Sequence, residues 1–219
     1  MIGAIILAAG LSRRMKRFKL LLPWGDATVI ERVVRTVGDA LPGEIVVVTG
    51  HRAEDVAAAL RGTRARMAYN PDYAAGEMLS SVQVGLLALA ADATGALVCL
   101  GDQPQMEVET VRAVLDAGEA AGWRRIIIPS YEMRAGHPIL LPRCAWPAVI
   151  EATTTLKDAL GPYRAEFSYV TVQTSSILAD LDTPEDYERT TLPGVEPSGG
   201  SVVVDKPAKA STPGNSEAQ

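Results

Sequence analysis

The sequence predicts an α/β fold of three layers, in which helices cover both faces of a mainly parallel β-sheet. Short, continuous runs of valine, isoleucine and leucine recur along the chain, and strands that are buried on both faces have this composition. Segments with helical periodicity separate these runs, and such alternation is typical of parallel sheets. The chain has 219 residues, 47% of them hydrophobic, which suits one globular domain with a full core.

The first apolar run, in MIGAIILAAG, predicts a strand at residues 2–8. It is short and has no basic segment before it, so we do not interpret it as a signal peptide. The remaining elements are expected to alternate as helix 29–40, strand 44–49, helix 53–60, strand 65–69, helix 79–91, strand 96–100, helix 108–121 and strands 125–128, 139–141 and 167–172.

A last helix is expected in DTPEDYERT, which starts at Asp182. Asp182 or Thr183 can cap it, Pro184 suits its first turn, and the acidic residues that follow favour the positive end of the helix dipole. From residue 192 the composition changes to Pro, Gly, Ser, Thr, Lys and Glu. We therefore predict a folded domain at residues 1–190 and a disordered tail at 191–219.

Charge and cysteine content narrow the class of protein. Lys and Arg number 21 against 26 Asp and Glu, which gives a net charge of −5. Since five of the basic residues lie within residues 13–19, the rest of the chain is strongly acidic, which argues against a nucleic-acid-binding surface. Cys99 and Cys144 form no spaced cluster, and no segment has the roughly 20 apolar residues of a membrane span. We expect a cytoplasmic protein that does not bind membranes.

The segment AAGLS, which follows the first strand, is the first candidate for a ligand site. In open parallel sheets ligands bind beyond the carboxyl ends of the strands, and small residues let backbone N–H groups approach an anion. The basic loop that follows this segment would neutralise a triphosphate. Arg14 can donate several hydrogen bonds from its guanidinium, and Lys19 carries its charge on a flexible side chain. A solvated basic loop without a ligand is the alternative. The glycines of a dinucleotide fingerprint are missing, and Met15 stands where a P-loop has its second glycine.

This stretch, LAAGLSRRMKRFKLLLPWG, resembles the signature L-A-A-G-x-S-x-R-M-G-x-x-K-x-L-L-x-x-x-G of the molybdenum cofactor nucleotidyltransferases. Lys16 stands where the family usually has glycine, which tolerates backbone angles that lysine does not. Ala9 before Gly10 is similar to the cytidylyl branch, whereas guanylyl relatives usually have a second glycine there. The resemblance extends over roughly residues 1–190 and implies a Rossmann-like nucleotidyltransferase fold.

Carboxylates at the same sheet edge are expected to hold Mg²⁺. Asp102, in VCLGDQP, directly follows a predicted strand and suits a hard cation, although a turn or capping role is the alternative. GDQP also matches a second family motif. Asp180 and Asp182 flank a leucine and would share one side of an extended chain. The resemblance implies that a late aspartate completes the metal site, and we choose Asp182; the alternative is that it only caps the final helix.

Two further motifs concern the base and the acceptor. Gly76 and Ser81 belong to GEMLSSVQVGL, whose serines either cap a helix or, as the resemblance implies, help to enclose the base. Gly136, His137 and Pro138 belong to RAGHPILL, which the resemblance places on the acceptor side. In the acceptor region many relatives carry a G-D-x-G-A-R-type segment, whereas this chain has TTTLKDALGPY at residues 153–163.

The resemblance implies transfer of CMP from CTP to molybdopterin or molybdenum cofactor, with release of pyrophosphate and with Mg²⁺ as cofactor; a molybdenum hydroxylase is a possible recipient. A phosphate nucleophile is already ionised, so alignment and charge neutralisation suffice for catalysis.

The alternative functions are a nucleotidyltransferase that uses GTP or a sugar or polyol phosphate, an NAD(P)-linked oxidoreductase, and a nucleotide-binding chaperone. The expected nucleotide-binding residues are Leu7, Ala8, Ala9, Gly10, Ser12, Arg14, Lys19, Gly76, Ser81 and Asp102, of which Arg14, Lys19 and Asp102 are catalytic, and Asp102 and Asp182 hold the metal.

Overall fold

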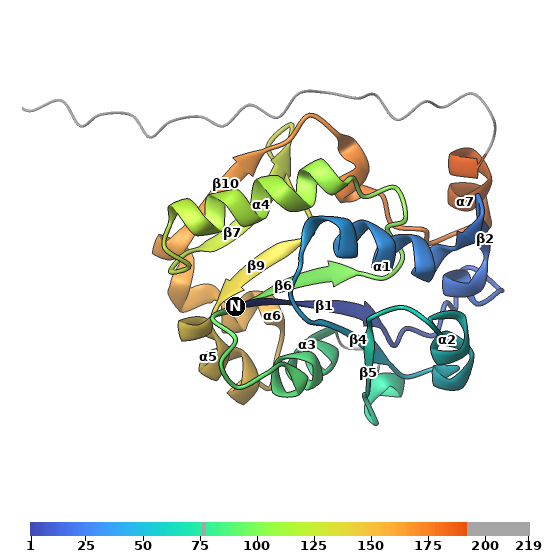
Figure 1. Cartoon of the computed structure of the whole chain (residues 1–219), viewed down its shortest axis with the longest axis horizontal. Coiled ribbons are helices and arrows are strands. Elements are labelled where there is room, and N and C mark those ends of the chain that lie inside the picture. The colour runs from blue at the N-terminus through green and yellow to red at the C-terminus, as the bar shows by residue number, and fades with distance from the viewer. Residues whose placement is uncertain (76–77, 192–219) are drawn as a thin grey trace, which may run out of the picture.

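A computed structural model of the chain describes residues 1–75 and 78–191. An eight-stranded sheet forms its centre, with the strands in the order β10-β7-β9-β6-β1-β4-β5 and β8 beside β7. Helices α1 and α4 cover one face of the sheet, and α3 and α5 cover the other (Figure 1). The predicted three-layer α/β fold is therefore confirmed.

The predicted strands all form, with small shifts at their ends. β1 pairs in parallel with β4 and β6, and β10 pairs in parallel with β7. β9 runs antiparallel to both β6 and β7, so the sheet is mixed but mainly parallel. The bounds are β1 Ile2–Ala8, β4 Ile45–Thr49, β5 Arg66–Tyr69, β6 Gly95–Leu100, β7 Ile126–Tyr131, β9 Ile139–Pro142 and β10 Phe167–Thr171.

The predicted helices also form, and one of them is shorter than expected. α3 ends at Ala88, because the N–H of Ala90 donates to Glu44 Oε2 at 3.0 Å instead of to a helical carbonyl. α1 begins in a capping box, in which Thr28 and Glu31 bond each other's backbone N–H groups. The bounds are α1 Val29–Ala40, α2 Ala53–Ala59, α3 Met78–Ala88, α4 Val108–Ala120 and α7 Pro184–Thr191.

Several short elements were not predicted from the sequence. They are the helices α5 Trp146–Glu151 and α6 Leu156–Ala159, the strands β2 Pro23–Trp24, β3 Ala27–Thr28 and β8 Arg134–Ala135, and the 3-10 helices η1 Lys19–Leu21, η2 Tyr73–Ala75, η3 Arg143–Ala145, η4 Gly161–Glu166 and η5 Ser175–Leu178. The expected tail falls almost wholly outside the described residues, although Thr191 is the last residue of α7. Among the described helices, none has the length and apolar character that crossing a membrane requires.

The core lies on both faces of β1, as its continuous apolar sequence predicts. Ala4 and Ile6 pack into the cluster under α1 and α4, whereas Ile5 packs into the cluster under α3. α3 approaches β1 closely at Gly85, where a Cβ would lie 2.4 Å from Ile5 Cγ2. This close approach places the first turn of α3 beside the carboxyl end of β1.

Glu44, just before β4, forms hydrogen bonds with β5 and with the segment after α3, and these bonds should stabilise the protein at neutral pH. Its Oε1 accepts from Arg66 Nε at 3.0 Å and its Oε2 accepts from the N–H of Ala90. The hydrogen bonds from Arg66 hold the pKa of Glu44 below its ordinary value of 4.5, so the stabilisation is present above that pH and is lost as the pH falls through the lowered pKa.

Glu44→Gln is expected to lower the free energy of unfolding at pH 7 by about 1–2 kcal/mol, because the charge-assisted hydrogen bonds from Arg66 and Ala90 weaken. It should also flatten the fall in stability below about pH 5. Urea unfolding at several pH values measures both effects, with the exposed Glu119→Gln as control. An identical pH dependence in the two variants would contradict the assignment.

Candidate functional site

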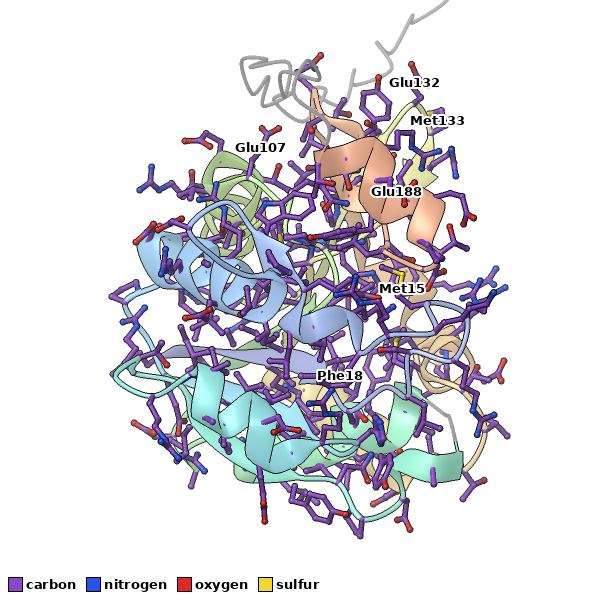
Figure 2. The ribbon with its side chains drawn as sticks, turned by 90° about the vertical axis from the view of Figure 1, so that its right-hand side faces the viewer. Met15, Phe18, Glu107, Glu132, Met133 and Glu188 are labelled. Carbon is purple, nitrogen blue, oxygen red and sulfur yellow. The ribbon has the colours of Figure 1, made fainter. Side chains whose placement is uncertain are left out.

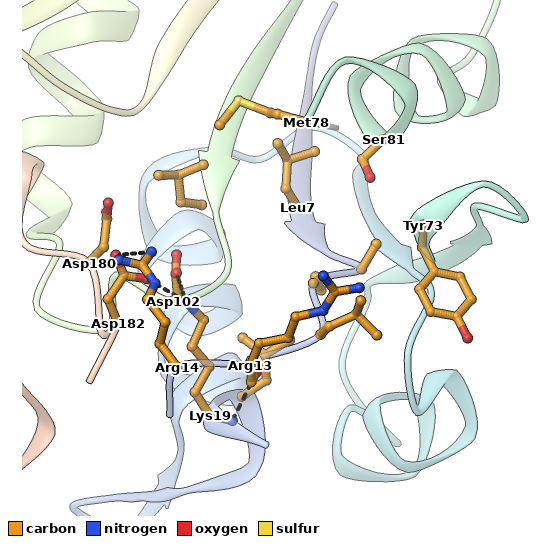
Figure 3. Close-up of a pocket in the computed structure, with 17 residues that line it drawn as sticks. Leu7, Arg13, Arg14, Lys19, Tyr73, Met78, Ser81, Asp102, Asp180 and Asp182 are labelled. Atoms are coloured by element: carbon orange, nitrogen blue, oxygen red, sulfur yellow. Dashed lines mark hydrogen bonds and ion pairs between the residues drawn. The ribbon is translucent and has the colours of Figure 1, made fainter. Parts of the chain in front are cut away.

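A cavity of about 490 Å³ opens at the carboxyl ends of β1 and β6 (Figure 3). Its walls come from the end of β1 and the turn behind it, the basic loop, the start of α3, and the segments after β6 and before α7. The predicted nucleotide-binding residues on its lining are Leu7, Ala8, Ala9, Gly10, Ser12, Arg14, Lys19, Ser81 and Asp102. Gly76 lies outside the described residues.

The turn after β1 leaves open space beside the cavity at Gly10. A Cβ at this position would have no neighbouring atom within 4 Å among residues 1–75 and 78–191, so their packing does not require glycine here. The N–H of Gly101 donates to Leu7 O at 2.9 Å and the N–H of His51 donates to Ala9 O at 3.3 Å, which fixes the turn against the ends of β6 and β4. The missing side chain of Gly10 therefore leaves room that a ligand can occupy.

The basic loop, residues 11–22, is anchored by its apolar residues. Met15, Phe18 and Leu20 are buried, and Figure 2 shows Met15 and Phe18 within the fold. Exposed basic residues flank Met15. The ring of Phe18 lies edge-on to that of His51, with centroids 5.5 Å apart. His51 is not among the residues that line this cavity. This anchoring holds the loop, and with it Lys19, at the sheet edge.

Lys16, which stands where the signature quoted above has glycine, adopts a backbone conformation that glycine favours. Its φ of +56° lies in the left-handed region, where a side chain is strained. Lys16→Gly is expected to leave activity unchanged and to raise the free energy of unfolding by up to about 1 kcal/mol, because the strain removed exceeds the chain entropy that glycine adds. The neighbouring Arg17, which has no positive φ, is the control.

Arg17→Gly should instead lower the free energy of unfolding by a few tenths of a kcal/mol, roughly the entropic cost of glycine. Urea denaturation of the two variants beside the parent protein measures the difference. Equal losses of stability in both would show that the left-handed conformation of Lys16 carries no strain.

Lys19 lies between two carboxylates at the floor of the cavity. Its Nζ contacts Asp102 Oδ2 and lies 3.3 Å from Asp182 Oδ1, while Arg14 Nη2 lies 2.7 Å from Asp182 Oδ2 (Figure 3). The side chains of Lys19 and Asp102 are 14% and 17% exposed, whereas that of Arg14 is 72% exposed. The ion pair between Lys19 and Asp102 is thus shielded from solvent. Solvent largely screens the ion pair between Arg14 and Asp182.

Asp182 does not cap α7. Thr183 does so, since its hydroxyl accepts from the N–H of Asp186 at 3.2 Å and the Asp186 carboxylate accepts from the N–H of Thr183 at 2.9 Å. The carboxylate of Asp182 therefore faces Lys19 and Arg14. A backbone bond from Leu181 N–H to Asp102 O, at 3.2 Å, holds this segment beside the end of β6.

Asp180 also lines the cavity, although the sequence reasoning gave it no role. Its Oδ1 accepts from Gln103 Nε2 at 2.8 Å. Burial, and then the nearby charge of Asp102, raise the pKa of Asp180. Tyr73, from η2, and Arg13 also line the cavity. The sequence has no motif at Tyr73, and of the five basic residues at 13–19 only Arg14 and Lys19 were expected to bind phosphate.

The two carboxylates fit a hard divalent cation. Asp102 and Asp182 already contact one positive charge, the ammonium of Lys19, so their oxygens are within reach of a single cation. Residues 1–75 and 78–191 contain no group of three or more metal-ligating side chains. Mg²⁺ binds commonly through one or two carboxylates with substrate phosphates, and this donor set matches that mode.

Ser81 lies on the opposite side of the cavity from Asp180 and Asp182 (Figure 3). It belongs to the first turn of α3, and its Oγ accepts from Asn70 Nδ2 at 3.0 Å. Asn70 is fully buried and donates equally to Ser80 Oγ. The hydroxyl of Ser81 is thereby fixed at the wall, where it can contact a nucleobase.

The motif at residues 136–138 lies away from this cavity. Gly136 is required by packing, because a Cβ there would be 2.2 Å from Ile177 O. Pro138 is buried, and His137 lines a second cavity. Burial lowers the pKa of His137 to about 4, so its imidazole is neutral at neutral pH. The acceptor-side role of this motif remains a prediction.

Comparison with known proteins identifies the family. The chain is 28% identical to molybdenum cofactor cytidylyltransferase of Escherichia coli K12 over 85% of its length and 93% of that protein. It is 31% identical to nicotine blue oxidoreductase of Paenarthrobacter nicotinovorans, over 72% of the chain and 78% of that protein.

A similar solved structure is that of Rv0371c from Mycobacterium tuberculosis H37Rv in complex with manganese. It is 27% identical in sequence, with a TM-score of 0.70, and the match covers 87% of this chain and 97% of that one. Residues 4–165, most of the described chain, match the family model of the MobA-like NTP transferase domain. The chain therefore belongs to the family of MobA-like NTP transferase domains.

Proposed function

We propose that the protein transfers CMP from CTP to molybdopterin or to the molybdenum cofactor, with release of pyrophosphate. The observation that carries this proposal is the convergence of Arg14, Lys19, Asp102 and Asp182 beside the small-residue turn after β1. Two cations for phosphate and two carboxylates for a divalent metal are what a nucleoside triphosphate requires. The relative named molybdenum cofactor cytidylyltransferase supports the choice of base and acceptor.

In the proposed reaction a phosphate oxygen of the acceptor attacks the α-phosphorus of CTP, and the bond to the β-phosphate oxygen breaks. The electron pair of that bond leaves with pyrophosphate. Lys19 and Arg14 bind the triphosphate oxygens, and the backbone of the turn at Gly10 lies against the nucleotide. A Mg²⁺ held by Asp102 and Asp182 would neutralise charge on the phosphates. No strong base is needed, because the attacking phosphate is ionised.

Pyrophosphate release tests the proposal. The protein is incubated with Mg²⁺, molybdopterin and each of CTP, GTP, ATP and UTP in separate reactions, with omission of molybdopterin as control. We expect release with CTP that depends on molybdopterin. Equal release with GTP would contradict the choice of base, and release with a sugar or polyol phosphate instead of molybdopterin would contradict the choice of acceptor.

Gly10→Val is expected to weaken CTP binding by about tenfold or more, because the added side chain enters the open space of the cavity. The melting temperature should change by less than about 2 °C, since the Cβ displaces no atom of the residues that the structure describes. Calorimetric titration with CTP and Mg²⁺ measures the affinity. Gly161→Val is the matched control, because a Cβ there also meets no atom within 4 Å. Unchanged CTP affinity in Gly10→Val would place the nucleotide elsewhere.

A second candidate function is NAD(P)H-dependent reduction, which the 31% identity to nicotine blue oxidoreductase favours. The turn after β1 counts against it, because the second and third glycines of a dinucleotide fingerprint are missing after Gly10. Titration with NADPH distinguishes the two functions. Tight NADPH binding together with an absence of pyrophosphate release would favour the oxidoreductase.

A further inference from the structure

Asp102 and Asp182 lie on the same side of the cavity described above, but segments of different kinds carry them (Figure 3). Asp102 lies two residues after β6, whose pairing with β1 and β9 fixes this part of the sheet. Asp182 lies between η5 and α7, in a segment of residues 179–183 that forms neither helix nor strand. The distance between the two carboxylates therefore depends on what holds this segment against the end of β6.

Gln103, the residue after Asp102, bonds the chain before Asp182 at two points. Its Nε2 donates to Ile177 O at 3.2 Å and to Asp180 Oδ1 at 2.8 Å. Since a carbonyl and a carboxylate accept hydrogen bonds, the nitrogen of the amide faces them. Gln103 is only 1% exposed, so its amide is shielded from solvent. This side chain thus links the end of β6 to residues 177 and 180.

Two further hydrogen bonds join the same two segments. Gln105 Nε2 donates to Ala179 O, and the backbone carbonyl of Asp102 accepts the bond from Leu181 described above. These two bonds and the two from Gln103 together form the glutamine clamp. The clamp ends one residue before the second carboxylate, so it limits where that carboxylate can lie.

Stability alone does not account for a glutamine at position 103. Its Oε1 is buried and has no hydrogen-bond partner within residues 1–75 and 78–191, and the same holds for the Oε1 of Gln105. An unpaired buried oxygen costs free energy that an apolar side chain of similar size would not. Proteins accept such costs mainly at functional sites, so we attribute a role in the site to the donors of the two glutamines.

We propose that Gln103 is a positioning residue for the divalent metal: through the glutamine clamp it holds Asp182 at the distance from Asp102 that a single cation requires. This inference rests on the proposed function, which places a metal between these two carboxylates. Gln103 acts on the metal through the segment that it holds and is not itself a ligand. Removal of a group that orients a metal ligand in this way commonly lowers metal affinity by about 10- to 100-fold.

Gln103→Met tests this role, because methionine preserves the approximate volume and the charge of the site but cannot donate the hydrogen bonds. Electron paramagnetic resonance of free Mn²⁺ measures the metal affinity of the nucleotide-free full chain. We expect Gln103→Met to bind Mn²⁺ about tenfold more weakly than the parent protein does. Gln105→Met removes a single bond of the clamp and should weaken Mn²⁺ binding by about threefold. It tests the same role if Gln103→Met does not fold.

Gln83→Met is the matched control. Gln83, in α3, donates to three backbone carbonyls between residues 149 and 152, and it does not line the cavity that contains Asp102. Its replacement should lower the melting temperature, because three hydrogen bonds are lost, but should leave Mn²⁺ affinity within about twofold of the parent value. Metal affinity therefore separates a positioning role from a structural role, which would lower stability alone.

The Mg²⁺ dependence of pyrophosphate release from CTP and molybdopterin is a second measurement. In Gln103→Met the half-maximal rate should need about tenfold more Mg²⁺, and saturating Mg²⁺ should restore kcat to within about threefold of the parent value. A loss of kcat that Mg²⁺ does not restore would contradict a role in positioning the metal.

Equal Mn²⁺ affinity in the parent protein and in Gln103→Met, an equal loss of affinity in Gln83→Met, or no Mn²⁺ binding by the parent protein would overturn the inference. If Gln103→Met does not fold, unchanged affinity in Gln105→Met would overturn it. Its failure is distinguishable from that of the proposed function. If Mn²⁺ affinity is unchanged in the folded variant while the parent protein releases pyrophosphate from CTP and molybdopterin, the positioning role fails and the function stands. If Mn²⁺ affinity falls as expected but the parent protein releases no pyrophosphate, the function fails and Gln103 still positions a metal site.

Discussion

Asp102→Asn should lower kcat for pyrophosphate release by about 100-fold or more. The substitution preserves size but removes the charge that contacts Lys19 and, in the proposed function, holds the metal. Loss of one charged group that stabilises a transition state commonly costs this much. Steady-state kinetics with CTP, molybdopterin and Mg²⁺ measures the change.

Two observations separate a catalytic loss from misfolding. The exposed Asp92→Asn, which lies in a loop, should keep full activity. The melting temperature of Asp102→Asn should fall by only a few degrees, about what the loss of one partly buried ion pair implies, since Asp182 still faces Lys19. A fully active Asp102→Asn protein would remove the metal site from the account.

Lys19→Met should have opposite effects on two measurements. Turnover is expected to fall by about 100-fold, because a phosphate-binding charge is lost. The affinity of the nucleotide-free protein for Mn²⁺ is expected to rise by about fivefold or more, because the Lys19 ammonium contacts both carboxylates and competes with a divalent cation for them. Electron paramagnetic resonance of free Mn²⁺ measures this affinity.

Arg14→Met is the matched control for the metal measurement. Its side chain is 72% exposed and, within the described part of the chain, forms an ion pair with Asp182 and not with Asp102, so its removal should change Mn²⁺ affinity less than removal of Lys19 does. Weaker Mn²⁺ binding in Lys19→Met than in the parent protein would show that the carboxylates do not form the metal site.

The main layers of the fold could be predicted because its strands are continuous apolar runs. β1 is buried on both faces, so its sequence carries a strong and local signal. α6, with four residues, and the two-residue strands carry too little periodicity to detect. The end of α3 depends on Glu44, which lies more than forty residues away in the sequence, and no local pattern contains that information.

In the site, too, some features have a signal in the sequence, whereas others depend on how distant residues pack. Arg14, Lys19 and Asp102 could be expected together because the carboxyl ends of parallel strands meet at one edge of the sheet. Asp182 follows no strand of the sheet, and only the family resemblance implied its place there. The contact of Lys19 with both carboxylates could not, because it depends on how Met15 and Phe18 anchor the loop. The second cavity forms between segments that are distant in the sequence, so only their packing reveals it.

The fate of the α-phosphate of CTP distinguishes cytidylyl transfer to molybdopterin from every alternative reaction considered above. The parent protein is supplied with molybdopterin, Mg²⁺ and CTP labelled at the α-phosphorus. We expect the label in a molybdopterin product that carries CMP, and none of it in pyrophosphate. Label that stays in unreacted CTP, or product that forms equally with labelled GTP, would contradict it.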